Sequence, residues 1–229
     1  MLMMSSWSTG DSEMRDDQGM QTYYGERAAY YDRVYAIPER QADLRLLESW
    51  IKDTFRSRRV LEIACGTGYW SRFIALVARQ LTATDISARV IDIAKQRENC
   101  ESVKFRIEDA FAMSPDLGHF ESLFSGLWIS HIPRQALRSF LEHVQQHLES
   151  GSEVVFIDNS RRQCEELPIV HTDGDGNTYQ DRQLDDGSRH RILKNFPGVL
   201  ELEAAIEDLG VNPRYEELDH YWWFTYCVK

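Results

Sequence analysis

Short apolar runs alternate with amphipathic stretches through the middle of the chain. The apolar runs, each bounded by polar or glycine-containing segments, cover residues 60–64, 81–84, 103–107, 122–128 and 154–157. The stretches between them that place apolar residues at helical spacing cover residues 69–79, 88–97 and 134–148. Strands that alternate with helices of this length predict βαβ units and a largely parallel sheet that is buried on both faces.

The same kind of pattern extends to both sides of this region. An amphipathic helix is expected from Pro38 to Phe55, and another from residue 199 to 209, where Gly210 ends it. Two final apolar stretches, 214–218 and 221–228, are expected to form strands. The fold class predicted from these elements is α/β, with a doubly wound sheet.

The remaining segments set the domain organisation. Residues 1–20 are polar and lack apolar periodicity, so we expect a disordered leader there and a single domain over residues 21–229. The alternation of strands and helices stops at about residue 161. Glycine-containing turns and short alternating runs up to residue 197 predict an inserted β-hairpin region.

Composition limits the class of partner. The chain has 37 acidic and 26 basic residues among its 229, which gives a formal net charge of −11. This balance argues against nucleic acid and anionic membranes and favours a small uncharged or cationic ligand. Because no apolar run reaches the roughly 18 residues of a membrane span, we expect a cytoplasmic protein. The four cysteines form no CxxC pair, so neither a metal site nor a disulfide framework is expected.

A glycine turn follows the first strand of the alternation. Gly66 and Gly68 allow the backbone to approach a ligand closely. A dinucleotide-binding fingerprint would place a third glycine where Ser71 stands, and Glu62 on the preceding strand favours a ligand ammonium group over a phosphate. A nicotinamide-dependent oxidoreductase is therefore the weaker alternative, beside a tight turn that binds nothing.

Carboxylates also follow the next two strands. Asp85 closes the second strand, at the interval after a glycine loop where an acidic residue chelates a ribose diol. Asp109 follows the third strand, and Phe111 offers an aromatic face beside it, a combination suited to an adenine ring. Since parallel strands end at one edge of a sheet, three acids at successive strand ends favour one adenosyl-binding site.

The segment Val-Leu-Glu-Ile-Ala-Cys-Gly-Thr-Gly at residues 60–68 resembles the first motif of class I S-adenosylmethionine-dependent methyltransferases, particularly bacterial members that act on small molecules. The resemblance runs from about residue 23 to the C-terminus. It implies a Rossmann-like, mostly parallel seven-stranded sheet that ends in an antiparallel hairpin, and S-adenosylmethionine as the cofactor. Ala64 departs from the glycine that many members have at that position.

The resemblance also distributes the cofactor over this chain. It implies that the methionine part lies against the glycine loop, the ribose at the end of the second strand and the adenine after the third. The residues expected at these three places are Glu62, Ala64, Gly66, Gly68 and Trp70, then Asp85 and Ile86, then Asp109, Ala110 and Phe111.

Five of the ten tyrosines fall between residues 23 and 35. Aromatic faces attract a positively charged sulfonium. We therefore expect residues 21–57 to form a helical lid in which Tyr23, Tyr24 and Tyr31 contact the cofactor, as similar leaders do in the family. The alternative is an amphipathic packing helix with tyrosines at helical spacing.

The acceptor side is expected at the end of the fourth strand. His131 is the candidate general base because the ordinary pKa of histidine is near neutral; alternatively it only packs against the cofactor. Polar residues of the insertion either line the acceptor pocket or lie exposed: His171, Asn177, Tyr179, His190 and Lys194. In-line transfer to a small, aromatic or heterocyclic acceptor is the expected reaction, and a non-catalytic cofactor-binding scaffold is the alternative. The sequence makes no prediction of oligomeric state.

Overall fold

The computed structural model of the chain describes residues 17–229. Most of the expected leader lies outside these residues, but helix α1 spans Asp17–Arg27 and therefore begins before residue 21, where we expected the domain to start. Arg27 in its last turn complements the helix dipole. Helical structure thus extends into the segment predicted as leader.

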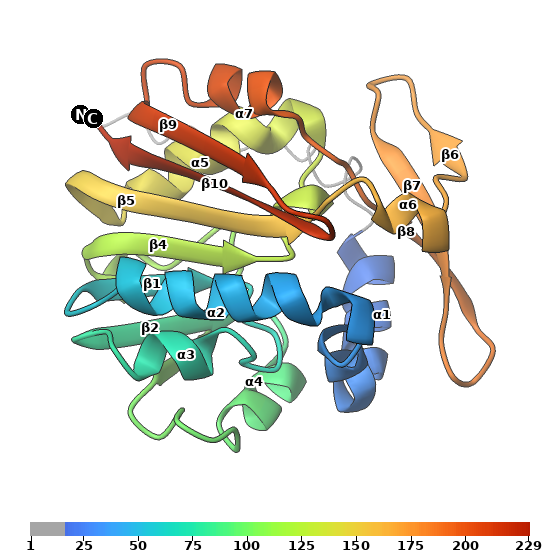
Figure 1. Ribbon diagram of the computed structural model, residues 1–229, viewed down its shortest axis with the longest axis horizontal. Helices are drawn as coiled ribbons and strands as arrows, with labels where there is room; N and C mark the ends of the chain where they lie inside the picture. Colours follow the sequence, from blue (N-terminus) through green and yellow to red (C-terminus); the bar gives the residue numbers. More distant parts are fainter. Residues whose placement is uncertain (1–16) are drawn as a thin grey trace, which may run out of the picture.

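A seven-stranded sheet forms the centre of the molecule, as the α/β prediction requires (Figure 1). Its order is β3-β2-β1-β4-β5-β10-β9, and β10 alone runs antiparallel to its neighbours. The strands are β1 (Arg59–Ile63), β2 (Gln80–Asp85), β3 (Lys104–Ile107), β4 (Phe120–Gly126), β5 (Leu148–Asn159), β9 (Gly210–Glu217) and β10 (Tyr221–Val228). The predicted C-terminal antiparallel hairpin is confirmed.

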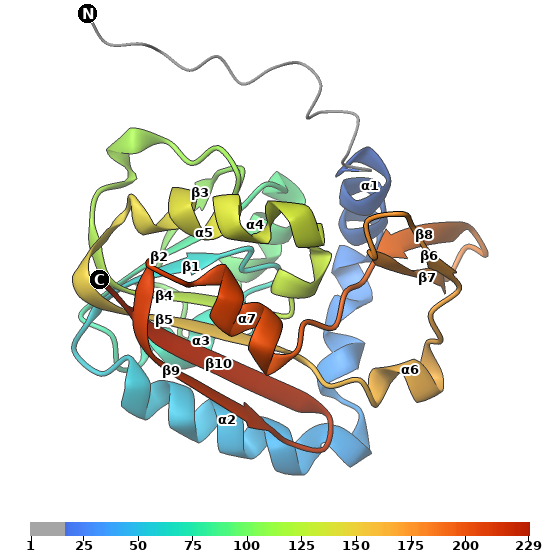
Figure 2. The same cartoon turned by 90° about the horizontal axis from the view of Figure 1, so that it is seen from above.

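Helices cover both faces of this sheet (Figure 2). One apolar core joins the sheet to α2 (Gln41–Thr54) and α3 (Ser71–Ala75), and the other joins it to α5 (Leu137–Gln145) and α7 (Val199–Ala205). Helix α4 (Ala88–Ala94) packs beside β2 and β3. The doubly wound arrangement follows from burial of apolar side chains on both sides of the parallel strands.

Several element boundaries differ from the prediction. The fourth strand ends at Gly126, two residues early, because Leu127 adopts a left-handed backbone with a φ of 59°. Helix α3 is a short five-residue helix, where apolar spacing predicted residues 69–79. Strand β5 is longer than predicted, because its polar first half pairs with β4 by backbone hydrogen bonds that hydrophobicity does not report.

The insertion is a small sheet and not a single hairpin. β6 (His171–Thr172), β7 (Thr178–Gln183) and β8 (Arg189–Leu193) form an antiparallel three-stranded sheet, preceded by α6 (Gln163–Glu166). This sheet lies beyond the carboxyl end of β4, and α1 lies between it and the main sheet (Figures 1 and 2).

The N-terminal segment reaches the main sheet through short 3-10 helices. After α1 come η2 (Ala28–Tyr35) and η3 (Pro38–Arg40), which lead into α2. Of the segment expected as a lid, α1 and η2 lie across the carboxyl ends of the strands, and we call these two elements the lid from here on (Figure 1). Helix α2, which the expected lid included, packs on a face of the main sheet instead. Within the described residues, every helix is too short or too polar to cross a membrane.

Candidate functional site

A cavity of about 960 Å³ lies where β1, β2, β3 and β4 end, beneath the lid. We call it the first cavity. Ten of the predicted site residues line it, from the ends of all four strands and from the lid: Tyr24, Tyr31, Ala64, Gly66, Asp85, Ile86, Asp109, Ala110, Phe111 and His131. Part of this volume is open to solvent, so the lining residues, and not the volume, indicate what the cavity binds. The topology thus brings together residues that lie more than a hundred positions apart in the sequence.

The glycine loop forms one wall of the first cavity. Gly66 has a φ of 54°, and a Cβ built at this position would meet no atom within 4 Å, so the loop leaves open space on the cavity side. Gly68 has a different role: a Cβ there would lie 3.0 Å from Cβ of Ala94. Gly68 therefore permits close packing on α4 and is not among the residues that line the cavity, and its expected ligand contact stays a prediction.

Ala64 sits in the left-handed region with a φ of 53°, a conformation that costs a non-glycine residue on the order of 1 kcal/mol. Leu127, which follows the neighbouring strand β4 and lines the same cavity, has a φ of 59°. Strained backbone of this kind persists where the surrounding structure holds it, and it clusters at ligand sites. The strain at both strand ends therefore supports a binding site between them.

Asp85 organises the loops around the cavity. Its Oδ2 accepts a hydrogen bond from the backbone N–H of Gly66 at 3.0 Å, and its Oδ1 accepts one from the N–H of Ser87 at 2.9 Å. Burial raises the pKa of the carboxyl, while these backbone hydrogen bonds oppose that shift. The carboxylate thus joins the glycine loop to the β2–α4 turn and remains in the cavity wall.

The far end of the first cavity is aromatic. Oδ1 of Asp109 accepts a hydrogen bond from the N–H of Phe111 at 2.9 Å, which fixes the turn after β3. The ring of Phe111 lies 5.6 Å from that of Trp128, which follows β4. A carboxylate beside two such rings suits a flat, amino-bearing heterocycle such as adenine.

Two predicted cofactor residues lie behind the cavity wall. Glu62 is 1% exposed and accepts a 2.6 Å hydrogen bond from Oγ of Ser71; burial raises its pKa to about 8. This pKa favours the neutral carboxyl at neutral pH, and the expected attraction of a ligand ammonium by Glu62 stays a prediction. Trp70 is buried and packs so closely on Gly126 that a Cβ there would meet its ring at 2.6 Å.

The lid contributes two tyrosines to the cavity and buries the third. Tyr24 and Tyr31 line it, with ring centroids 5.9 Å apart. Tyr23 is 2% exposed and packs instead between Leu184 and Ile192 of the insertion. The three predicted contacts therefore divide: Tyr23 attaches the lid to the insertion sheet, whereas the other two face the cavity.

An ion pair fixes the lid to the glycine loop. Oγ1 of Thr67 donates a 2.6 Å hydrogen bond to Asp32 of η2, and Arg97 of the α4 region pairs with the same carboxylate. Nε of Arg97 also donates to the backbone oxygen of Thr67 at 2.7 Å. The position of the lid is thereby tied to the loop whose conformation Asp85 controls.

A second cavity adjoins the first. Four residues line both of them: Tyr24, Tyr31, Leu127 and His131. The second cavity lies between the lid, α6 and the insertion sheet; its volume of about 740 Å³ is partly open to solvent. Its wall contains four basic residues and one acidic residue: Arg27, Arg40, Arg182, Lys194 and Glu166. The four shared residues thus lie at the junction of the first cavity and a second, basic one.

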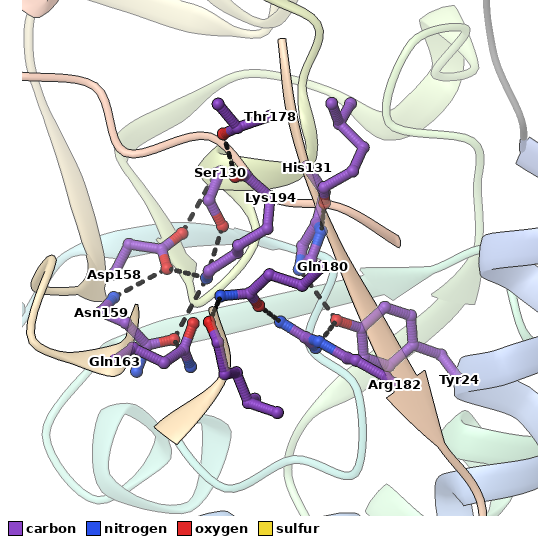
Figure 3. A network of polar contacts seen from close by, with 12 residues as sticks. Tyr24, Ser130, His131, Asp158, Asn159, Gln163, Thr178, Gln180, Arg182 and Lys194 are labelled. Atoms are coloured by element: carbon purple, nitrogen blue, oxygen red, sulfur yellow. Dashed lines mark hydrogen bonds and ion pairs between the residues drawn. The ribbon is translucent and has the colours of Figure 1, made fainter. Parts of the chain in front are cut away.

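A chain of hydrogen bonds crosses this junction (Figure 3). Nδ1 of His131 lies 2.6 Å from the backbone oxygen of Leu193, which accepts only, so Nδ1 carries the proton. Nε2 then accepts from the hydroxyl of Tyr24 at 2.9 Å, and that hydroxyl accepts from Arg182 at 3.0 Å. Burial, with help from nearby Lys194 and Arg182, lowers the pKa of His131 to about 3. The imidazole is therefore neutral, and both of its nitrogens are hydrogen-bonded.

A buried ion pair supports the segment that carries His131. Nζ of Lys194 donates to Asp158 and Ser130, both at 2.7 Å, and to Asn159 at 3.1 Å (Figure 3). Burial by itself would raise the pKa of Asp158, but the pair with Lys194 brings it below its ordinary value. Asp158 also accepts from the N–H of Ser130. The pair thus joins β5, the segment after β4 and the insertion.

The other polar residues considered for an acceptor pocket divide in a similar way. Lys194 lines the second cavity, as expected. Asn177 is buried in contacts with Arg134 and Asp173, Tyr179 donates to Asp173, and His171 is exposed. Sequence reasoning missed Arg182 and Arg40. Arg182 lies two residues after buried Gln180 on strand β7, where buried and exposed residues alternate. This period of two is the sequence signal that could have placed Arg182 on the inward face of the strand.

Comparison with known proteins agrees with this geometry. A family described as "Methyltransferase domain" matches residues 60–152. The DhpI-SAM-HEP complex superposes with a TM-score of 0.76 at 29% identity, covering 96% of this chain and 99% of that one; the DhpI-SAH complex gives 0.75 at the same identity, covering 92% and 96%.

Two curated relatives carry the name malonyl-[acyl-carrier protein] O-methyltransferase. The Pectobacterium atrosepticum protein is 24% identical over 90% of this chain and 83% of its own length. The Bacillus cereus protein is 29% identical over 55% of this chain, and the match spans about half (48%) of that relative's length.

Proposed function

Because the chain belongs to the class I S-adenosylmethionine-dependent methyltransferases, we propose that it transfers a methyl group from a cofactor in the first cavity to a small molecule in the second. The observation that carries this proposal is the junction at Tyr24, Tyr31, Leu127 and His131, which belong to both cavities. In-line displacement needs the methyl donor and the acceptor on opposite sides of such a junction.

The residues of the first cavity fit S-adenosylmethionine. Open space at Gly66 leaves room for the methionine part, Asp85 stands where a ribose diol would bind, and Asp109 with Phe111 suits the adenine. Tyr24 and Tyr31 present aromatic faces to a cationic sulfur. When bound, this cofactor supplies an electrophilic methyl carbon attached to a sulfur leaving group.

The protein itself aligns the reactants and excludes water. The lid, held by the Asp32–Thr67 hydrogen bond, covers the junction and keeps Tyr24 over it. His131 fixes the hydroxyl of Tyr24 through Nε2. A general-base role for His131 stays a prediction. With both nitrogens engaged, a proton would reach His131 through the Tyr24 hydroxyl.

Oxygen is the acceptor atom that the relatives' names support, since the matched curated proteins are O-methyltransferases. Our expectation of an aromatic or heterocyclic acceptor stays a prediction, as does the cytoplasmic location. Family membership speaks against the nicotinamide-dependent alternative, in agreement with Ser71 at the position of a third glycine.

A labelled-methyl assay tests the proposal. The purified protein is incubated with methyl-labelled S-adenosylmethionine and a panel of small oxygen nucleophiles, while calorimetry measures binding of S-adenosylhomocysteine and of NAD. We expect S-adenosylhomocysteine to bind at one site and label to reach at least one acceptor. Binding without transfer to any acceptor would favour the scaffold alternative, and binding of NAD in place of S-adenosylhomocysteine would overturn the proposal.

A further inference from the structure

We propose that the second cavity selects an organic acid, and that the guanidinium of Arg182 binds the anionic oxygen group that receives the methyl. The inference rests on the proposed function and names its substrate class. It depends on the charges in the wall of the second cavity, on their partners, and on the distance from Arg182 to the junction.

Arg182 is a buried charge with only neutral partners. The residue is 7% exposed, and its guanidinium donates to the hydroxyl of Tyr24 at 3.0 Å and to Oε1 of Gln180 at 2.9 Å. Among residues 17–229 no carboxylate lies within ion-pair distance of it. An arginine stays charged at all working pH values, and buried charges in proteins are normally paired. The pairing charge is therefore expected from a ligand.

The other charged residues of the second cavity do not neutralise Arg182. Lys194 is matched by Asp158 at 2.7 Å, and Arg40 by Glu166 at 3.0 Å. Arg27, like Arg182, donates to a tyrosine hydroxyl, that of Tyr23 at 3.1 Å. After these pairs are subtracted, Arg27 and Arg182 leave the described wall with a net positive charge. Such a surface attracts an anion and disfavours a cationic or neutral acceptor.

Arg182 also lies at the place where transfer is expected. The Tyr24 hydroxyl that accepts its hydrogen bond belongs to the residues shared by both cavities, and the same hydroxyl donates to His131 (Figure 3). One hydrogen bond therefore separates the guanidinium from the junction. A forked guanidinium suits the two oxygens of a carboxylate or a phosphonate.

An acid acceptor also simplifies the chemistry. A carboxylate or phosphonate oxygen is already anionic at neutral pH, so it attacks with its own lone pair and no base removes a proton. The oxygen–methyl bond forms, the carbon–sulfur bond breaks with its electron pair going to sulfur, and the products are a methyl ester and S-adenosylhomocysteine. His131, neutral and hydrogen-bonded at both nitrogens, then acts as a positioning residue for Tyr24.

Calorimetry on the complex with S-adenosylhomocysteine tests this inference without needing turnover. Phenylacetate, propionate and ethylphosphonate are titrated, with phenylacetamide and propionamide as neutral counterparts of the two carboxylates. We expect at least one acid to bind at one site, about tenfold or more tighter than its amide where the amide exists. Failure of every acid to bind, or equal affinity for acid and amide, would overturn the inference.

Variants assign the effect to Arg182. We expect Arg182→Gln to weaken acid binding about tenfold or more, and Arg182→Lys to weaken it less. The matched control is Arg191→Gln, on the neighbouring strand β8, where the side chain is exposed and pairs with Asp181. If acid affinity survives in Arg182→Gln, the inference is wrong. The comparison of acid with amide in the unaltered protein holds even if a variant fails to fold.

Two further measurements distinguish failure of this inference from failure of the proposed function, and identify whether the acid is free or attached to a carrier. Binding of S-adenosylhomocysteine is measured first: its absence contradicts the proposed function, whereas its presence without acid binding contradicts the substrate class alone. Malonyl-pantetheine and a malonyl-carrier protein are then compared as methyl acceptors with the free acids. Methylation of either malonyl compound supports a tethered acid, and methylation of the free acids alone supports a free one.

Discussion

The hydroxyl of Tyr24 lies 2.9 Å from Nε2 of His131, which joins the lid to the segment after β4. These residues are 107 positions apart in the chain, and both line the first and the second cavity. A single hydrogen bond thus closes the junction at which donor and acceptor are expected to meet. The ring and the hydroxyl of Tyr24 therefore have separate expected roles. The ring faces the cofactor, and the hydroxyl belongs to the hydrogen-bond chain.

Replacing Tyr24 in two ways separates these roles. Tyr24→Ala removes the aromatic face, and we expect it to weaken S-adenosylmethionine binding about 2- to 30-fold, the range of a cation–π contact. Because S-adenosylhomocysteine has no sulfonium charge, its affinity is expected to fall less. Calorimetry measures both ligands. Equal losses for the two would assign the ring to packing alone.

Tyr24→Phe keeps the ring and removes the hydroxyl that Arg182 and His131 share. We expect the affinity for S-adenosylmethionine to change by less than about threefold, while methyl transfer falls about tenfold or more because buried polar groups lose their partner. Steady-state kinetics with a fixed acceptor measures this split. Unchanged transfer would show that the hydrogen-bond chain does not support catalysis.

Asp85→Asn tests the ribose side of the first cavity. The change removes the negative charge that accepts from Gly66 and Ser87, so we expect S-adenosylhomocysteine to bind about tenfold or more weakly. Asp92→Asn is the matched control, since Asp92 is exposed on α4 near the same strand. Equal affinities for the two variants would place the adenosyl group elsewhere.

Glu62 predicts a pH dependence of stability. Burial raises its folded-state pKa to about 8 from an ordinary value of 4.5, so between these values the folded state binds the proton that the unfolded state has released. Stability from this group is therefore full below about pH 4.5 and declines as pH rises toward 8.

Glu62→Gln removes this titration and keeps an oxygen to accept from Ser71. We expect the Tm of the variant to rise relative to the unaltered protein as pH increases from 5 to 8. Thermal unfolding followed by circular dichroism at several pH values measures the difference. A difference that stays constant over this range would show that Glu62 is ionised in the folded protein.

Lys194→Met leaves Asp158 buried and unpaired, and is expected to lower the free energy of unfolding by about 3–5 kcal/mol. The double variant Lys194→Met, Asp158→Asn removes the remaining charge and is expected to recover part of that loss. Urea unfolding of the single and double variants measures it. A double variant no more stable than Lys194→Met would mean that the lost hydrogen bonds, and not the unpaired charge, set the cost.

The sequence predicted the sheet and the residues that follow its strands, because the carboxyl ends of parallel strands meet at one edge whatever the side chains do. Asp85, Asp109 and the glycine loop were placed in this way. It did not predict which side chains face the cavity. Strand β1 is buried on both faces, so its residues do not alternate between apolar and polar. The sequence therefore could not show that Glu62 lies behind the wall of the first cavity.

Net charge does not report the local charge of a cavity, for a related reason. A total of −11 favoured a neutral or cationic ligand, yet the second cavity gathers four basic side chains from the lid, from η3, from strand β7 and from the segment after β8. Composition averages over the surface, whereas a local potential depends on which segments the fold brings together. Arg182 and Arg40 were therefore missed until the insertion was placed beside the lid.

A crystal structure with bound S-adenosylhomocysteine tests the central claim most directly. The account predicts the adenosine between Asp85 and Phe111 in the first cavity, with the sulfur directed toward Tyr24 and the second cavity beyond it. Adenosine bound in the second cavity, or a sulfur directed away from the Tyr24–His131 junction, would contradict it.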